Sequence, residues 1–235
     1  MKKISRRNGL AAYLRSHEHK GGIIVCEEPK FIYMKPAKTA GTSILRVGLE
    51  KRLPGIFHYK DRPEQFERWI SQIADEDLNE YFIFSVVRNP WDRLVSIAAH
   101  FEIPFKDFVA DFNEYLQDYT IRMHSLPLSS YTHFDKKQFV DFYCRFECLQ
   151  PDMNLVFDRL GLKREKLGFV NRSKHAHYSS YYTDTDAAKK LVESVYQKDI
   201  DYFGYMYEPD LKNKNVMTQI THKLLGSRTS IKFSK

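Results

Sequence analysis

Cysteine is scarce in this sequence, and its scarcity argues against two kinds of small, cross-linked protein. The 235 residues include three cysteines, Cys26, Cys144 and Cys148, an odd number in no compact arrangement. A disulfide framework needs pairs, and a structural zinc site needs CxxC-type spacing, which Cys144 and Cys148 do not have. We therefore expect buried thiols in a reducing compartment and no metal site.

Long apolar runs are missing as well. No stretch of about 18 apolar residues occurs, and the basic start, MKKISRRNGLAAYLRSHEHKGG, lacks the apolar segment of a signal peptide. The sequence also contains no internal repeat and no low-complexity linker. We expect a soluble chain without a transmembrane segment.

The composition is that of a single globular domain. Hydrophobic residues make up 43% and aromatic residues 14% of the chain, which is enough for a single sizeable core. The formal charge of +7 suits anionic ligands. This charge does not by itself indicate nucleic acid, which we do not expect as a partner, and the oligomeric state is left open.

A phosphate-holding loop is indicated by residues 31–49, FIYMKPAKTAGTSILRVGL. An apolar run leads into a loop and then a helix, an arrangement that turns backbone N–H groups and the Lys38 ammonium toward one anion. Lys38 precedes Gly41, so the segment does not match the GxxxxGK[ST] motif of magnesium-dependent nucleotide hydrolases. An ordinary helix start, capped by Thr39 or Thr42 with Lys38 in solvent, is the alternative interpretation.

A second segment strengthens the first. Residues 81–87, YFIFSVV, are typical of a buried parallel strand, and Asn89 and Pro90 favour a helix that starts there and runs through WDRLVSIAAHF. Ligands of open α/β sheets bind at the carboxyl ends of the strands. Arg88 and the 38–43 loop can therefore reach one site if their strands are neighbours. A local ion pair between Arg88 and Asp92 is the alternative.

Helical patterns dominate the rest of the chain. Aromatic and aliphatic residues at helical spacing predict a helix over 105–117, and another is expected over 151–160, ending at Gly161. The fold class we predict is α/β, a single domain with a central, mostly parallel sheet flanked by helices.

The two motifs together resemble a known family. KTAGTS followed by FSVVRNPWDRLVS is similar to the sulfotransferase superfamily that uses 3′-phosphoadenosine 5′-phosphosulfate (PAPS), in its carbohydrate-type branch. The resemblance continues through 144–162, 171–184 and 198–205. It implies a sulfotransferase fold like that of P-loop nucleotide hydrolases. We expect a basic extension over 1–25, a sulfotransferase domain over 26–210 and a basic tail over 211–235.

The resemblance also implies a nucleotide site. In that family the first loop binds the 5′-phosphosulfate of PAPS, and the arginine and serine of the second motif bind its 3′-phosphate. Carried over, Arg88 and Ser96 hold the 3′-phosphate, and we add Arg172. The residues expected around the 5′ end are Lys38, Thr39, Ala40, Gly41, Thr42 and Ser43.

Catalysis by such an enzyme needs a cation at the leaving phosphate and a base at the acceptor hydroxyl. Lys38 suits the first role. Histidine suits the second, and we expect His58, which lies between the two motifs as the base histidine does in several carbohydrate sulfotransferases. His124 and His100 are the next candidates. The carboxylates of Glu147 and Asp92 stay in reserve, each an expected partner of a nearby arginine.

The resemblance thus implies an enzyme that moves a sulfuryl group from PAPS to an acceptor hydroxyl, expected on a saccharide or glycan, releasing the desulfated nucleotide PAP. A phosphate-loop kinase and a non-enzymatic nucleotide- or polyanion-binding protein remain as alternatives. We expect a bacterial-type cytoplasmic enzyme. The alternative is a secretory-pathway enzyme without its membrane anchor.

Overall fold

A five-stranded sheet forms the centre of the computed structural model, which describes residues 5–16, 22–50, 52–59, 63–168, 176–183 and 186–208. Its strands lie in the order β3-β1-β2-β4-β7. β1 is antiparallel to both neighbours, whereas β2 pairs in parallel with β4, and β4 with β7. The strand bounds are β1 Gly22–Glu27, β2 Lys30–Lys35, β3 Ile56–His58, β4 Phe82–Val87 and β7 Phe142–Arg145.

All strands except β1 therefore point to the same edge of the sheet. This confirms the predicted α/β fold with a mostly parallel sheet. It also confirms that the strands leading to the phosphate loop and to Arg88 are neighbours, since Phe31 of β2 pairs with Phe82 of β4. A separate hairpin joins β5 His133–Phe134 to β6 Lys137–Gln138.

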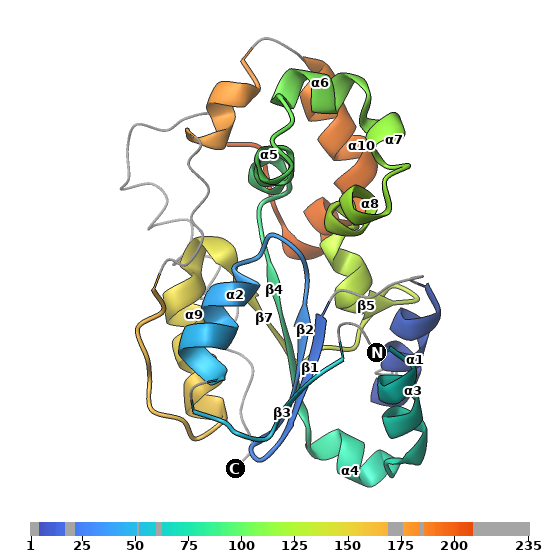
Figure 1. Ribbon diagram of the computed structural model, residues 1–235, viewed down its shortest axis with the longest axis vertical. Coiled ribbons are helices and arrows are strands. Elements are labelled where there is room, and N and C mark those ends of the chain that lie inside the picture. The colour runs from blue at the N-terminus through green and yellow to red at the C-terminus, as the bar shows by residue number, and fades with distance from the viewer. Residues whose placement is uncertain are drawn as a thin grey trace.

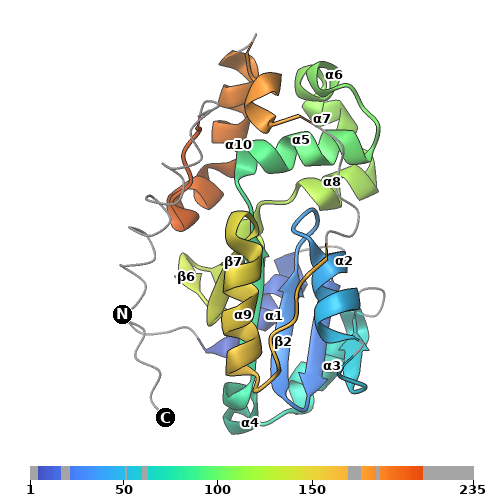
Figure 2. The same ribbon diagram turned by 90° about the vertical axis from the view of Figure 1, so that its left-hand side faces the viewer.

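Helices cover both faces of the sheet (Figures 1 and 2). Side chains along β2 alternate between two cores: Phe31 and Tyr33 belong to one buried cluster, and Ile32 and Met34 to the other. The first face carries α2 Gly41–Ser43, the π-helix Ile44–Leu49 and α9 Leu149–Arg159; the second carries α1 Arg6–Ser16, α3 Pro63–Gln72 and α4 Asp75–Glu80.

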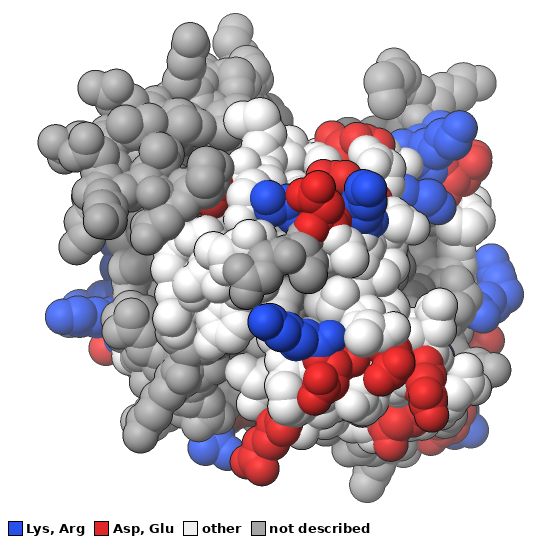
Figure 3. Space-filling model, turned by 90° about the horizontal axis from the view of Figure 1, so that it is seen from above, with Lys and Arg blue, Asp and Glu red and all other residues white. Residues whose placement is uncertain are grey.

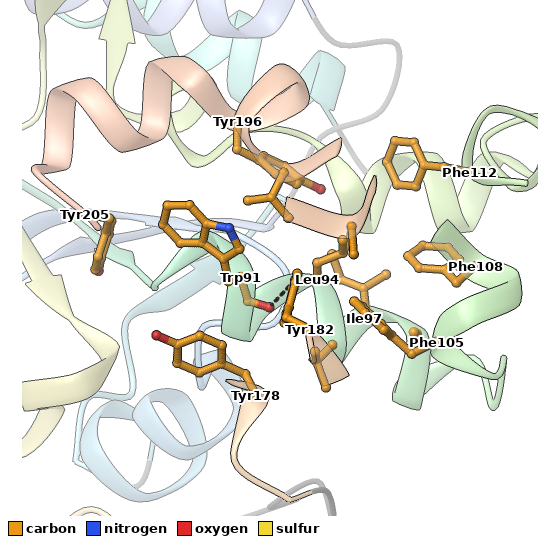
Figure 4. Close-up of a cluster of buried hydrophobic side chains, with 14 of the residues drawn as sticks. Trp91, Leu94, Ile97, Phe105, Phe108, Phe112, Tyr178, Tyr182, Tyr196 and Tyr205 are labelled. Atoms are coloured by element: carbon orange, nitrogen blue, oxygen red, sulfur yellow. Dashed lines mark hydrogen bonds between the residues drawn. The ribbon is translucent and has the colours of Figure 1, made fainter. Parts of the chain in front are cut away.

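A third group of helices lies above the carboxyl edge of the sheet. It consists of α5 Pro90–His100, α6 Phe105–Ala110, α7 Phe112–Tyr115, α8 Tyr119–Ser125 and α10 Asp186–Phe203. Figure 4 shows the aromatic core that joins these helices, with Trp91 of α5 beside Tyr178 and Tyr182. The hydroxyl of Tyr182 donates to the Trp91 carbonyl at 3.0 Å. Short 3-10 turns complete the structure at η2 Leu128–Tyr131, η3 Phe146–Cys148 and η4 Tyr178–Tyr181.

The prediction of one helix over 105–117 is wrong in one respect, because the segment forms two helices. Asp111 separates α6 from α7 with φ −112° and ψ 29°, outside the helical region. Aspartate is a poor residue for a helix interior. Phe108 and Phe112 still meet edge to face across the break, with ring centroids 5.5 Å apart.

The start of α5 agrees with its sequence signals. The Asn89 side chain accepts the N–H groups of Trp91 and Asp92 at 3.0 and 3.2 Å, and Pro90 occupies the first helical position. In the described ranges, no helix combines the length and the apolar character needed to cross a bilayer.

Candidate active site

The loop between β2 and α2 rises from the carboxyl edge of the sheet toward α5 (Figure 1). Lys38 and Ala40 both have left-handed backbone conformations, with φ 63° and 62°. Thr39 between them is fully buried and its hydroxyl donates to the Pro36 carbonyl at 2.9 Å. Left-handed residues next to a helix start turn backbone N–H groups into an anion-binding concavity, and the strain of holding two of them is typical of functional loops.

The helix after the loop begins without a side-chain cap. Its N-cap is Ala40, which makes no side-chain cap hydrogen bond. The alternative in which Thr39 or Thr42 caps an ordinary helix start is therefore not what the structure shows. A Cβ at Gly41, the first helical position, would lie 2.6 Å from Cε of Lys35, so that flexible side chain would have to move.

Positive charge accumulates around this loop. Burial, followed by the charges of Arg88 and Arg93, lowers the pKa of Lys38 from 10.5 to about 8. The three cationic side chains come from different elements: Lys38 from the loop, Arg88 from the end of β4, and Arg93 from α5. A cluster of cations that disfavours its own charge in this way is stabilised by an anion.

Arg88 connects the second motif to the loop. It is 5% exposed, its Nη1 donates to the Lys38 carbonyl at 2.9 Å, and its guanidinium lies 4.1 Å from the centre of the Phe146 ring. Its Nε also donates to Asp92 at 2.8 Å. The local ion pair expected as the alternative thus exists, but it coexists with contact to the phosphate loop.

Arg93 is a part of the site that the sequence reasoning missed. It is 1% exposed, and it donates to the Ala37 carbonyl at 3.3 Å and to the His124 carbonyl at 2.7 Å. Arg93 therefore ties the phosphate loop to α8. The signal that was available is its place in the same motif as Arg88, one helical turn into α5.

Two histidines lie close to these cations. The rings of His100, at the end of α5, and His124, in α8, stack with centroids 5.2 Å apart. Burial and then the charge of Lys38 lower the pKa of His100. Burial also lowers the pKa of His124, with smaller contributions from His100, Lys38 and Arg93.

The structure places His58 elsewhere. It ends β3, which is separated from β2 by β1, a lateral distance of about 10 Å across two strand spacings. Its Nε2 lies 3.1 Å from a carboxylate oxygen of Glu50. Glu50 follows the π-helix, at the end remote from the phosphate loop. His58 is thus not brought into the group formed by Lys38, Arg88 and Arg93.

The other predicted residues divide into three groups. Ser43 is buried at the start of the helix, with Thr42 partly exposed beside it. Ser96 is buried in α5 at 1% exposure, two turns beyond Arg88. Arg172 lies outside the described residues.

Glu147 holds the turn that carries Arg88. One carboxylate oxygen accepts the Asn89 backbone N–H at 2.6 Å, and the other accepts the Tyr205 hydroxyl at 3.0 Å. The carboxylate thus links the end of β4 to the segment after α10. This contact gives Glu147 a positioning role next to the site.

Comparison with known families bears directly on this arrangement. A model described as "Sulfotransferase family" matches residues 21–206, most of the chain. The chain belongs to the sulfotransferase family. The match to this sulfotransferase includes both the phosphate loop and the Arg88 turn.

Other comparisons add little about function. An uncharacterized protein of Archaeoglobus fulgidus is 25% identical over 114 residues, which cover 46% of this sulfotransferase and 91% of that relative. No solved structure matches. The described part of the chain contains no group of three or more His, Cys, Asp or Glu side chains able to hold a metal ion.

Proposed function

We propose that this protein transfers the sulfuryl group of PAPS to a hydroxyl of a saccharide or glycan, releasing PAP. The observation that carries the proposal is the convergence of Lys38, Arg88 and Arg93 on a left-handed loop at the carboxyl edge of the sheet. Family membership supports sulfuryl transfer in general. The donor and the acceptor class are the proposed part.

The chemistry asks little of the protein beyond position and charge. The acceptor oxygen forms a bond to sulfur while the bond from sulfur to the 5′-phosphate oxygen breaks, and the hydroxyl proton leaves to a base. Negative charge develops on the departing phosphate oxygen, where a buried cation is worth most. We assign that task to Lys38, which the carbonyl contact of Arg88 holds in its left-handed conformation.

PAPS carries anionic groups at both ends of its ribose, and the residues fit such a ligand. The loop supplies Lys38 and backbone N–H groups for the 5′ end of the nucleotide. The other loop residues proposed to surround that end are Thr39, Ala40, Gly41, Thr42 and Ser43. Arg88, already 5% exposed and tied to the loop, is the proposed partner of the 3′-phosphate. Ser96 belongs to the same proposal.

A discrete anion fits the described surface better than an extended polyanion. On the face seen from above, the Lys and Arg side chains of the described residues lie beside Asp and Glu side chains (Figure 3). A broad field of one sign, which a surface-bound polyanion would use, is not present on this part of the described surface. Buried cations at the loop favour a small ligand with localised charge.

The proposal is tested by incubating the purified protein with sulfur-labelled PAPS and a panel of acceptors. The panel holds neutral oligosaccharides, acidic oligosaccharides and simple phenols. We expect the label to be transferred to a saccharide. After digestion with a glycosidase, the label should remain on the released saccharide fragment. Transfer to phenols alone would contradict the carbohydrate acceptor, and transfer to no acceptor with no release of PAP would contradict the proposed reaction.

A further inference from the structure

Helix α8 is fixed beside the phosphate loop by contacts at its carboxyl end. Arg93, which is 1% exposed, donates to the Ala37 carbonyl of the loop and to the His124 carbonyl of α8. Just beyond α8, the buried carboxylate of Asp199 accepts the N–H groups of Leu128 and Ser129 at 2.6 and 2.7 Å. His124 is therefore held in a defined place relative to the loop.

The imidazole of His124 is oriented by a second contact. Its Nδ1 lies 2.8 Å from the Thr120 carbonyl oxygen. A carbonyl oxygen accepts hydrogen bonds and does not donate them, so Nδ1 carries the proton and the lone pair is on Nε2. The ring contacts both His100 and Phe101, with both centroid distances 5.2 Å. The side chain remains partly exposed, which leaves room for a substrate.

Burial and nearby cations favour the neutral form of His124. Lys38 of the loop, Arg93 and His100 of α5 all add to burial in lowering its pKa, and the Thr120 carbonyl opposes them. A lowered pKa favours the uncharged imidazole, which is the form that can take up a proton. It is suited to act as a base.

We propose that His124 is the general base that accepts the proton of the acceptor hydroxyl on its Nε2 atom. This inference rests on the proposed function and names the base of that same site. As the acceptor oxygen bonds to sulfur, its proton passes to Nε2, and the electron pair of the broken bond leaves with PAP. The imidazolium then forms beside the newly charged phosphate. The negative charge of this phosphate offsets the positive charge of the neighbouring cations.

The same geometry separates His124 from His58. The charge of Lys38 acts on His124, whereas the contact of His58 is with Glu50. Replacing each in turn therefore decides between them. His124→Asn is the more informative change at position 124, because the asparagine amide can still donate to the Thr120 carbonyl but offers no basic nitrogen.

The test measures two properties of His124→Asn, His124→Ala and His58→Ala: calorimetric affinity for PAP, and release of PAP from PAPS with water as the acceptor. Water needs no identified saccharide. We expect both His124 variants to bind PAP within a few-fold of the wild type and to release it about 10²- to 10⁴-fold more slowly, the usual range for loss of a base. Added imidazole should restore part of the rate in His124→Ala.

Nitrogen-15 spectra of the imidazole rings in the free protein give a readout independent of turnover. They should show His124 protonated on Nδ1 and bare on Nε2 at neutral pH, with its pKa rising in Lys38→Met. An Nε2-protonated ring would overturn the inference.

The rate outcomes separate two failures. If His124→Asn keeps wild-type turnover, or if His58→Ala is the variant that loses it, the inference is wrong while the proposed function stands. If the wild-type protein neither binds PAP nor releases it from PAPS, the proposed function fails and the inference with it.

Discussion

Lys38 is subject to two opposing effects at the residue scale. Its left-handed backbone and its burial hold the ammonium at the loop, yet burial and the charges of Arg88 and Arg93 disfavour that charge. The native state therefore loses stability from this group as the pH falls from about 10.5, where the unfolded lysine takes up its proton, to about 8, where the partly buried lysine does, and the loss is complete below that pH. A bound anion reverses this cost.

The first prediction concerns the pH dependence of PAP binding. Affinity should fall as the pH rises through about 8, where Lys38 loses its proton, although an exposed lysine would stay charged to about 10.5. Calorimetry in two buffers of different ionisation enthalpy should also reveal proton uptake on binding above this pH. The matched variant Lys38→Met should bind more weakly and show neither effect. A wild-type affinity that stays constant through this window would contradict the role of Lys38.

The second prediction concerns Arg88→Ala. Loss of a charge-assisted contact costs about 1.5–3 kcal/mol, so PAP affinity should drop about ten- to a hundredfold. ADP lacks the 3′-phosphate, and its affinity should change much less. Arg88→Lys keeps the charge without the guanidinium fork, so its affinity for PAP should lie between those of the wild type and Arg88→Ala. An unchanged ratio of PAP to ADP affinity in Arg88→Ala would show that Arg88 does not bind the 3′-phosphate.

Some contacts of the site could be predicted from the sequence, and others depend on tertiary packing. Lys38 and Arg88 could be predicted together because the neighbouring parallel strands that carry them end at one edge. The bridge from Arg93 to the carbonyls of Ala37 and His124 could not, since it depends on how α8 packs over the loop. Tertiary packing also decides the place of His58, so nothing in the sequence indicated that His58 ends an edge strand beside Glu50.

At the scale of elements, the turn from β4 into α5 follows from local signals. A buried apolar run, an asparagine cap and a proline at the first helical position are adjacent in sequence and need no tertiary contact to act. The split between α6 and α7 at Asp111 is different. Periodicity alone does not reveal it, because Phe108 and Phe112 are four residues apart and would share one face of a continuous helix as well.

The third prediction tests the cap of α5. Asn89→Ala removes the acceptor for two N–H groups and should lower the unfolding free energy by about 1 kcal/mol, seen as a fall of about 2–4 °C in Tm. Asn89→Asp keeps the acceptor and should retain stability. Its new negative charge beside Arg88 should nevertheless weaken PAP binding. Equal melting temperatures for wild type and Asn89→Ala would show that the cap contributes nothing.

At the scale of the whole molecule, the sheet and the upper helices have separate tasks. The sheet, with helices on both faces, sets the positions of the phosphate loop and Arg88. The helices above its edge, joined by the aromatic core in Figure 4, supply Arg93, His100 and His124. The site therefore forms where the two groups meet, which explains why the fold class could be predicted and the full residue set could not.

The most direct test of this account is a calorimetric titration of the purified protein with PAP, ADP and magnesium-ATP, at low and high salt because screening weakens exposed charge contacts. The account predicts that PAP binds clearly more tightly than ADP, and that magnesium-ATP gains no preference over either. The added 3′-phosphate contact should account for the difference. Preference for magnesium-ATP, or binding of none of the three nucleotides, would contradict it.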